Sequence, residues 1–242
     1  MTEENEKLLS ISEAAELLGV SVMTLRRWDE SGRLVSIRKK EGGNRYYRKI
    51  DIENFMNDLL QIAKDWVLNA TDLPENFYCQ NSAIFQSRLA KMENLMLQNK
   101  ISEDFASRVV SIIGEIGNNS FDHNLAQWPD IPGILFAYDL NKKQIILADR
   151  GLGIFKTLKR VKPEIENDEQ ALMVAFTEII SGRAPEERGN GLKYVKFIIS
   201  KNQINLFFQT GEAILILNAN SSKLEISKAK DNFHGCLAVI KW

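Results

Sequence analysis

Acid, amide and histidine side chains gather near the middle of the sequence, in residues 114–124. Apolar side chains recur at helical spacing up to this stretch, which predicts a helix that ends in it: Phe105, Val109, Ile112, Ile113 and Ile116. An α-helix turns about 100° per residue, so Glu115, Asn119 and Asp122 share one narrow face, with His123 at its edge. Carboxylate and amide oxygens one turn apart could hold a hard cation or a water. A solvated helix end with an Asn-rich C-cap has the same composition.

Two glycine-rich segments follow this helix in the sequence. The first begins with Asp149, at the end of a predicted strand, and continues to Gly151 and Gly153. A carboxylate at a strand end can accept a hydrogen bond from an exocyclic amine, and glycines let a flat ring approach the backbone. The second contains Gly189 and Gly191 and opens a predicted helix, whose N-terminal N–H groups attract phosphate. A tight turn and a helix N-cap are the structural alternatives for the two segments.

The elements around these segments predict an α+β two-layer sandwich. Strands are predicted at 134–138 and 144–148, and four more near 204–208, 213–218, 223–226 and 235–241. Helices are predicted from Ser102 to the polar stretch, from about Asp168 to Ile180, and after Gly191. We expect these helices to cover one face of a mixed sheet. An earlier helix, with apolar residues between 84 and 96, is expected to pack on this domain or across a dimer.

The first 62 residues predict a smaller, mainly α domain. Ser12 is the expected N-cap of a short helix that Gly19 ends, and Ser21 is the N-cap of a second helix that runs to about Ser31. Two short helices joined by a tight turn form a helix-turn-helix. Residues 34–49 then predict a β-hairpin wing around a Gly-Gly-Asn turn. Asp51 is the expected cap of a third helix that continues to residue 68.

Positive charge is concentrated on this domain, although the net charge of the chain is only -1. Between positions 26 and 49 there are nine Lys and Arg residues and three acidic ones, an excess of six positive charges. That density fits a surface for a phosphate backbone. A helix-turn-helix that contacts protein, with a solvated basic face, is the alternative.

The N-terminal sequence resembles the MerR/excisionase type of winged helix-turn-helix. The residues that carry the resemblance are Ser10–Ser21 (SISEAAELLGVS), Thr24–Trp28 (TLRRW) and Asn44–Tyr47 (NRYY). The resemblance implies that the second helix enters the DNA major groove and that the wing contacts the backbone. Its DNA-contact candidates, with two basic residues of the wing added, are Thr24, Arg26, Arg27, Arg38, Lys39, Arg45 and Tyr46. Trp28 continues an apolar stripe and is expected in the core, and the lack of clustered cysteines argues against metal sensing.

Residues 100–242 resemble the GHKL (Bergerat-fold) ATP-binding family, which includes gyrases, histidine kinases and anti-sigma-factor kinases. That family has three motifs in a fixed order. The chain has the same order: the helix that carries Glu115 and Asn119 (the acid-amide helix), then Asp-x-Gly-x-Gly, then Gly-x-Gly-Leu. The resemblance implies that Asn119 binds Mg²⁺ and that Glu115 activates water or a substrate hydroxyl. Asp149 would bind the adenine amino group. The other implied ATP contacts are His123, Gly151, Gly153, Arg188, Gly189, Gly191 and Leu192. Cys236 departs from the family, which often has Gly-Thr where this chain has Gly235-Cys236.

We therefore expect a DNA-binding domain at 1–62, a helical connector with a candidate dimer contact at 63–101, and an ATP-binding domain at 102–242. Two distant cysteines without a CxxC pair fit a reducing compartment and no metal framework. With no long apolar run and an acidic start, they predict a cytoplasmic protein without a membrane segment. The expected partners are double-stranded DNA, ATP with Mg²⁺ and a second copy of the chain.

Three functions remain open at this point. The first is a DNA-binding regulator whose ATP-bound state alters DNA or partner binding. The second is a serine/threonine kinase or ATPase that resembles anti-sigma-factor kinases, with Glu115 as base, a STAS-like partner and a helix-turn-helix used for localisation. The third is a module that holds nucleotide only structurally. No histidine occurs in residues 60–101, which argues against a histidine kinase with its own phosphoacceptor.

Overall fold

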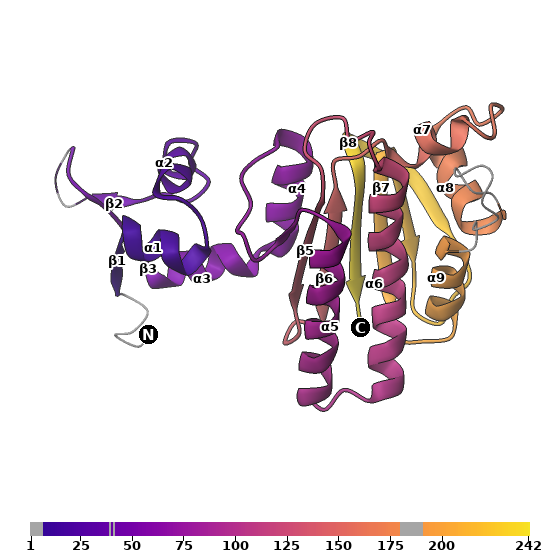
Figure 1. Cartoon of the computed structure of the whole chain (residues 1–242), viewed down its shortest axis with the longest axis horizontal. Coiled ribbons are helices and arrows are strands. Elements are labelled where there is room, and N and C mark those ends of the chain that lie inside the picture. Colours follow the sequence, from indigo (N-terminus) through magenta and orange to yellow (C-terminus); the bar gives the residue numbers. More distant parts are fainter. Residues whose placement is uncertain (1–6, 39, 41, 180–190) are drawn as a thin grey trace.

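The computed structural model describes residues 7–38, 40, 42–179 and 191–242 of the chain. A small unit built on a three-stranded sheet is followed by a larger unit built on a five-stranded sheet (Figure 1). Within the described residues, no helix is long and apolar enough to cross a lipid bilayer.

The small unit is a winged helix-turn-helix. Its elements are β1 (Leu8–Ser10), α1 (Ile11–Leu18), α2 (Val22–Glu30), β2 (Ile37–Arg38), β3 (Arg45–Arg48) and α3 (Lys49–Asn57). The strands are antiparallel in the order β1-β3-β2, so β1 adds a strand to the expected hairpin. Leu18, Leu25 and Tyr47 are fully buried between the helices and the sheet. Trp28 is buried with them, as predicted.

Two predicted helix caps in this unit are wrong. The cap of α1 is Ser10 and not Ser12: the Ser10 hydroxyl accepts from the Glu13 N–H at 3.3 Å, and the Glu13 carboxylate accepts from the Ser10 N–H at 2.7 Å. This reciprocal pair is a capping box. Likewise α3 begins at Lys49, before the expected cap Asp51.

The third helix does not continue to residue 68. It ends at Asn57, and Asp58 accepts from the Gln61 N–H at 3.2 Å to start a separate helix, α4 (Leu59–Asn69). Asp58 is in neither the helical nor the extended region, with φ -94° and ψ 61°. The chain therefore turns here, and α4 packs on the larger unit through Ile62, Trp66 and Val67.

The larger unit contains one antiparallel sheet in the order β4-β5-β6-β8-β7. Its strands are β4 (Tyr78–Cys79), β5 (Ile134–Asp139), β6 (Gln144–Asp149), β7 (Asn205–Leu217) and β8 (Glu225–Lys241). The expectation of a mixed sheet is therefore wrong. The four strands expected after residue 200 form only two long strands, β7 and β8. The first two expected strands are one, because β7 continues through the register shifts at Thr210, Gly211 and Ala213. The short strand β4 was not predicted.

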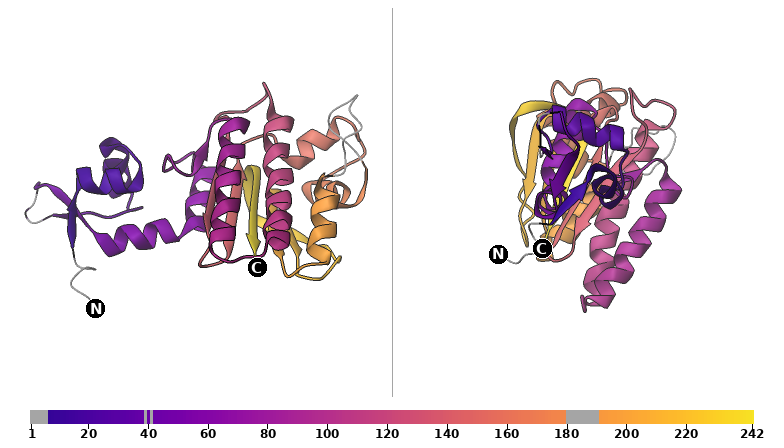
Figure 2. Two further views of the ribbon diagram at one scale, coloured as in Figure 1. Left: turned by 60° about the horizontal axis from the view of Figure 1, so that its bottom comes forward. Right: turned by 90° about the vertical axis from the view of Figure 1, so that its left-hand side faces the viewer.

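Helices cover both faces of this sheet, although two layers were predicted. The helices are α5 (Ser82–Gln98), α6 (Glu103–Asn124), α7 (Gly153–Lys159), α8 (Asp168–Thr177) and α9 (Gly191–Ser200), together with α4. Alternate residues of β5 point to opposite sides: Phe136 packs in the cluster of α5, α6 and α9, whereas Leu135 packs in that of α4. The left view of Figure 2 shows α5 and α6 side by side in front of the sheet. The apolar face of α5 is thus buried within the chain, against α6.

Candidate functional site

The start of α9 lies directly against the polar end of α6. A Cβ atom added at Gly191 would lie 2.4 Å from Oε2 of Glu115 and 3.4 Å from Nδ2 of Asn119. Any side chain at position 191 would therefore displace the Glu115 carboxylate. Glu115 and Asn119 are both partly exposed, so the two polar groups border a surface that solvent reaches. The structure brings together the acid-amide helix and the second glycine-rich segment.

The other residues expected in this region differ in their surroundings. His123 is partly exposed one turn beyond Asn119 on α6. Leu192 packs against the main core of the sheet, which makes it a supporting residue of the α9 start. Arg188 and Gly189 lie outside the described residues.

Asp149 ends β6 as a buried carboxylate, with 2% of its surface exposed. Its Oδ2 accepts from the Ser120 hydroxyl at 2.7 Å, and its Oδ1 accepts from the Gly151 N–H at 2.8 Å. Burial raises the pKa of Asp149 to about 6, against hydrogen bonds from Ser120, Gly151 and the Cys236 backbone that lower it. A carboxylate has about four acceptor positions, so these three donors leave room for one more.

Asn124, at the end of α6, holds the turn after Asp149. It is 4% exposed; its Oδ1 accepts from the Leu152 N–H at 2.7 Å and its Nδ2 donates to the Ser120 carbonyl at 2.7 Å. A Cβ at Gly151 would lie 2.1 Å from Nδ2 of Asn124, so only glycine fits there. Neither Ser120 nor Asn124 was among the predicted site residues. Their four-residue spacing on a predicted helix was the available signal, since it puts them on one face.

Gly153 adopts a φ of 75°, a conformation that favours glycine, and the next turn is held by a buried hydroxyl. Oγ1 of Thr210 accepts from the Ile154 N–H at 3.2 Å and donates to the Gly235 carbonyl at 2.9 Å. Sγ of Cys236 is 3.6 Å from the same hydroxyl. Burial raises the pKa of the Cys236 thiol well above its usual range, so the thiol is neutral. A hydroxyl therefore lies beside Gly235 even though position 236 is cysteine.

The basic residues of the helix-turn-helix are not equally available. Arg26 is exposed on α2 and has no ion pair with any described residue. Arg27 is also exposed, but its guanidinium pairs with Asp72. Tyr46 is partly exposed on β3. Lys39 lies outside the described residues.

The Asp29 carboxylate holds both wing arginines, Arg38 and Arg45, against α2. Asp29 accepts from Arg45 Nε at 2.6 Å and from Arg38 Nη2 at 3.1 Å, and Arg45 also reaches Glu30 at 3.2 Å. Burial by itself would raise the pKa of Asp29, but hydrogen bonds from Arg45, Ser36 and Arg38 hold it well below its usual range. Asp29 is thus ionised and fixes the wing beside the second helix.

Thr24 does not present its side chain to the surface. It is 5% exposed, its hydroxyl is 2.9 Å from that of Ser21, and its N–H donates to the Ser21 hydroxyl at 3.0 Å. In this arrangement Thr24 stabilises the start of α2 and does not reach a base edge. Its expected role as a DNA contact has to be revised for this conformation.

Comparison with known proteins identifies the small unit. Residues 10–47 match the family described as MerR family regulatory protein. The chain is also similar to the type II methyltransferase M.Eco47II of Escherichia coli, with 42% identity over 69 residues. That similarity covers 28% of this chain and 16% of the methyltransferase, so the chain spans only a small part of its relative's length. Residues 10–47 form a MerR-family helix-turn-helix domain, which suggests a DNA-binding regulator.

Proposed function

We propose that the protein is a DNA-binding regulator whose larger unit binds Mg-ATP and whose nucleotide state changes DNA or partner binding. One observation carries the nucleotide half of this proposal. A single helix, α6, contacts both glycine-rich segments: Glu115 and Asn119 face Gly191, while Asn124 holds the turn at Gly151. Residues far apart in the sequence are thereby gathered along one side of the sheet.

The residues present fit the nucleotide. Gly191 opens α9, and the backbone N–H groups and positive dipole end of a helix N-terminus suit phosphate. The carbonyl oxygen of Asn119 and the carboxylate of Glu115 are hard donors of the kind Mg²⁺ prefers. Because Mg²⁺ keeps several waters and uses few protein ligands, it does not need a cluster of acids. No group of three His, Cys, Asp or Glu side chains suited to a metal occurs in the described ranges.

Each residue has a distinct part in this proposal. Asp149 accepts the exocyclic amine of adenine, and Gly151 and Gly153 let the ring approach the backbone. Asn119 holds the metal. The residues proposed at the phosphates are His123, Arg188, Gly189 and Gly191, with Leu192 as the support of the α9 start. Bound Mg²⁺ would neutralise phosphate charge.

Equilibrium binding of a fluorescent ATP analogue in Mg²⁺ tests the nucleotide half. The wild-type protein is expected to bind, and Asp149→Asn and Asn119→Ala are expected to bind at least about tenfold more weakly, a loss of roughly 1.4 kcal/mol. Glu169→Gln, a partly exposed position on α8, is the matched control and should bind like wild type. Absence of binding by the wild-type protein would reject the proposal.

The second candidate is a serine/threonine kinase or ATPase with Glu115 as the general base. Its support is the position of the Glu115 carboxylate, which is partly exposed and lies at the start of α9, where the phosphates are proposed to bind. Its Oε2 is 2.4 Å from the place that a Cβ atom at position 191 would take. A base must lie within hydrogen-bond reach of the group it deprotonates. Release or transfer of labelled phosphate should then be lost in Glu115→Gln while ATP binding is kept. The proposed phosphoryl acceptor is a serine or threonine of a STAS-like partner. If the wild-type protein neither releases nor transfers phosphate, the enzyme hypothesis fails.

A further inference from the structure

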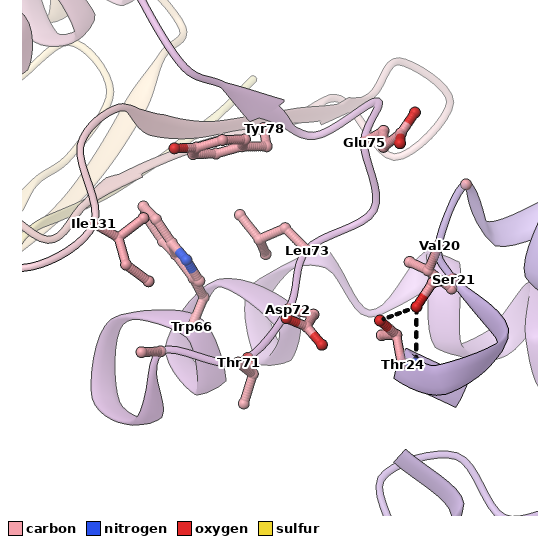
Figure 3. A pocket seen from close by; sticks show the side chains of 12 residues that line it. Val20, Ser21, Thr24, Trp66, Thr71, Asp72, Leu73, Glu75, Tyr78 and Ile131 are labelled. Carbon is pink, nitrogen blue, oxygen red and sulfur yellow. Dashed lines mark hydrogen bonds between the residues drawn. The ribbon is translucent and has the colours of Figure 1, made fainter. Parts of the chain in front are cut away.

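The segment that follows α4, residues 71–75, lies against the helix-turn-helix; we call it the strap. Asp72 pairs with Arg27 of α2, and the Glu75 N–H donates to the Gly19 carbonyl at 3.1 Å. Gly19 is the turn between α1 and α2, so the strap contacts both the turn and the second helix. Figure 3 shows Asp72 and Leu73 between Trp66 on one side and Ser21 and Thr24 on the other.

An open pocket lies beside the contact between the strap and the small unit. It has a volume of about 330 Å³ and is lined by Ser21 and Thr24 on one side and by Trp66, Thr71 and Tyr78 on the other. A contact bordered by an open pocket resembles an interface between domains more than it resembles a closed core.

Hydrogen bonding at this contact is also incomplete. Among the described residues, Oγ1 of Thr71 and both Nε and Nη2 of Arg33 are buried without a hydrogen-bond partner. Arg33 lies 4.6 Å over the ring of Trp28, and its Nε is 3.5 Å from Asp65. Burial lowers the pKa of Arg33, against the nearby charges of Asp65 and Asp72 that raise it. A buried polar group without a hydrogen-bond partner costs free energy. If the strap separates from the small unit, these groups bind water again, which offsets part of the cost of the separation.

The end of α4, just before the strap, is attached to the candidate nucleotide site through Arg150. Asp149 and Arg150 are neighbours, and successive side chains of a strand point to opposite faces. Asp149 accepts from Ser120 of α6, whereas Arg150 reaches the other face of the sheet, where its Nη1 donates to the Trp66 carbonyl at 2.8 Å and also to that of Val67. These carbonyls lie in the last turn of α4, just before the strap.

Asp130 completes this attachment. Arg150, which is 6% exposed, also donates from Nε to Oδ2 of Asp130 at 3.0 Å. A buried guanidinium with this many partners is a rigid support. Through these bonds a shift at the end of β6 would be passed to the end of α4 and to the strap.

We propose that the strap is an autoinhibitory element in which the Asp72 carboxylate takes the place of a DNA phosphate on Arg27. Because the Arg27–Asp72 pair is exposed on both sides, it adds little to stability, and a phosphate can compete with it. Thr24, which stabilises the start of α2, lines the open pocket beside the same strap. The inference rests on the proposed function, since it needs both DNA binding and the nucleotide site next to Arg150.

The test uses the full-length protein and a DNA duplex selected from random sequence by the protein itself. Asp72→Asn is expected to bind this duplex about two- to fivefold more tightly than wild type, the range of an exposed ion pair. Glu75→Gln is the matched control. It removes the same charge from the same segment, but the hydrogen bond of Glu75 to the small unit comes from its backbone N–H, which the substitution keeps, so its affinity should rise less. On an Arg27→Ala background, Asp72→Asn should have no effect.

Equal DNA affinities of wild type, Asp72→Asn and Glu75→Gln would overturn the autoinhibitory role of the strap while leaving DNA binding in place. Failure to select any duplex would instead reject the proposed function, and the strap with it. Mg-ATP tests the route through Arg150: it should change the DNA affinity of the wild-type protein and leave that of Asp72→Asn unchanged. No change in the wild type, or an equal change in both proteins, would overturn that route. Thermal unfolding should give the same midpoint for all three proteins, because the substituted side chains are at the surface.

Discussion

The hydroxyl of Ser120 donates a 2.7 Å hydrogen bond to the carboxylate of Asp149, although the two residues lie on a helix and a strand 29 positions apart. This bond joins the polar helix to the first glycine-rich segment. Asn124, one turn further along α6, joins the same helix to the Leu152 N–H. The candidate site is therefore organised around α6, and its acid is held in a fixed position before any ligand arrives.

The ionised form of Asp149 should reduce the stability of the folded protein near neutral pH. Its pKa is raised from 3.8 to about 6 on folding, so its favourable contribution is complete below pH 3.8 and is lost as the pH rises through 6. We expect Asp149→Asn to raise the free energy of unfolding at pH 7.5 by on the order of 2 kcal/mol, and by clearly less at pH 5. Urea unfolding at the two pH values measures this difference. The exposed Asp231→Asn is the control and should show none. A gain that is the same at both pH values would contradict the pKa shift.

Gly191→Ala should lower nucleotide affinity with little effect on stability, whereas Gly117→Ala should lower stability. At Gly191 the added Cβ meets the flexible end of Glu115, so stability should change by less than about 1 kcal/mol while affinity for the ATP analogue falls on the order of tenfold. At Gly117 the Cβ would lie 2.2 Å from the buried ring of Phe85, which should cost about 1–3 kcal/mol. Denaturant unfolding and ligand titration of both variants check the contrast. Unchanged affinity in Gly191→Ala would remove the start of α9 from the site.

Asn124→Ala should destabilise the protein by about 1–3 kcal/mol, because it leaves the Leu152 N–H without its acceptor. Asn118, on the same helix, bonds to Gln86 at the surface at 2.8 Å. Asn118→Ala should cost less than about 1 kcal/mol, since water can replace that bond. Urea denaturation curves compare the two. Equal losses would mean that Asn124 acts only through helix propensity.

The pair Arg26→Ala and Arg27→Ala should weaken DNA binding and flatten its salt dependence. If each guanidinium contacts one phosphate, the slope of log affinity against log salt should become less steep by about 2. Fluorescence anisotropy across a series of salt concentrations gives the slope. Lys201→Ala, an exposed site on the larger unit, should leave it unchanged. An unaltered slope in the double variant would place the DNA on another surface.

The local elements could be predicted from the sequence because their signals are local. Apolar periodicity placed the helices, Ser21 caps α2 as expected, and the order of polar and glycine-rich segments drew attention to Glu115, Asn119 and Asp149. The errors also arose where the local signal is ambiguous. Ser10 and Ser12 are both good N-caps, and only the reciprocal bond with Glu13 selects the first.

Only the tertiary structure decided which distant groups meet. No periodicity reveals that Ser120 and Asn124 hold the turn after Asp149, that α4 leaves α3 to cover the second face of the sheet, or that Asp72 reaches Arg27. These contacts depend on chain reversals and strand pairings, whose free energy comes from burial summed over the whole core. The sequence by itself determined the helix-turn-helix and the polar segments. The packing of α6 between the two glycine-rich segments determined how those segments form one candidate site.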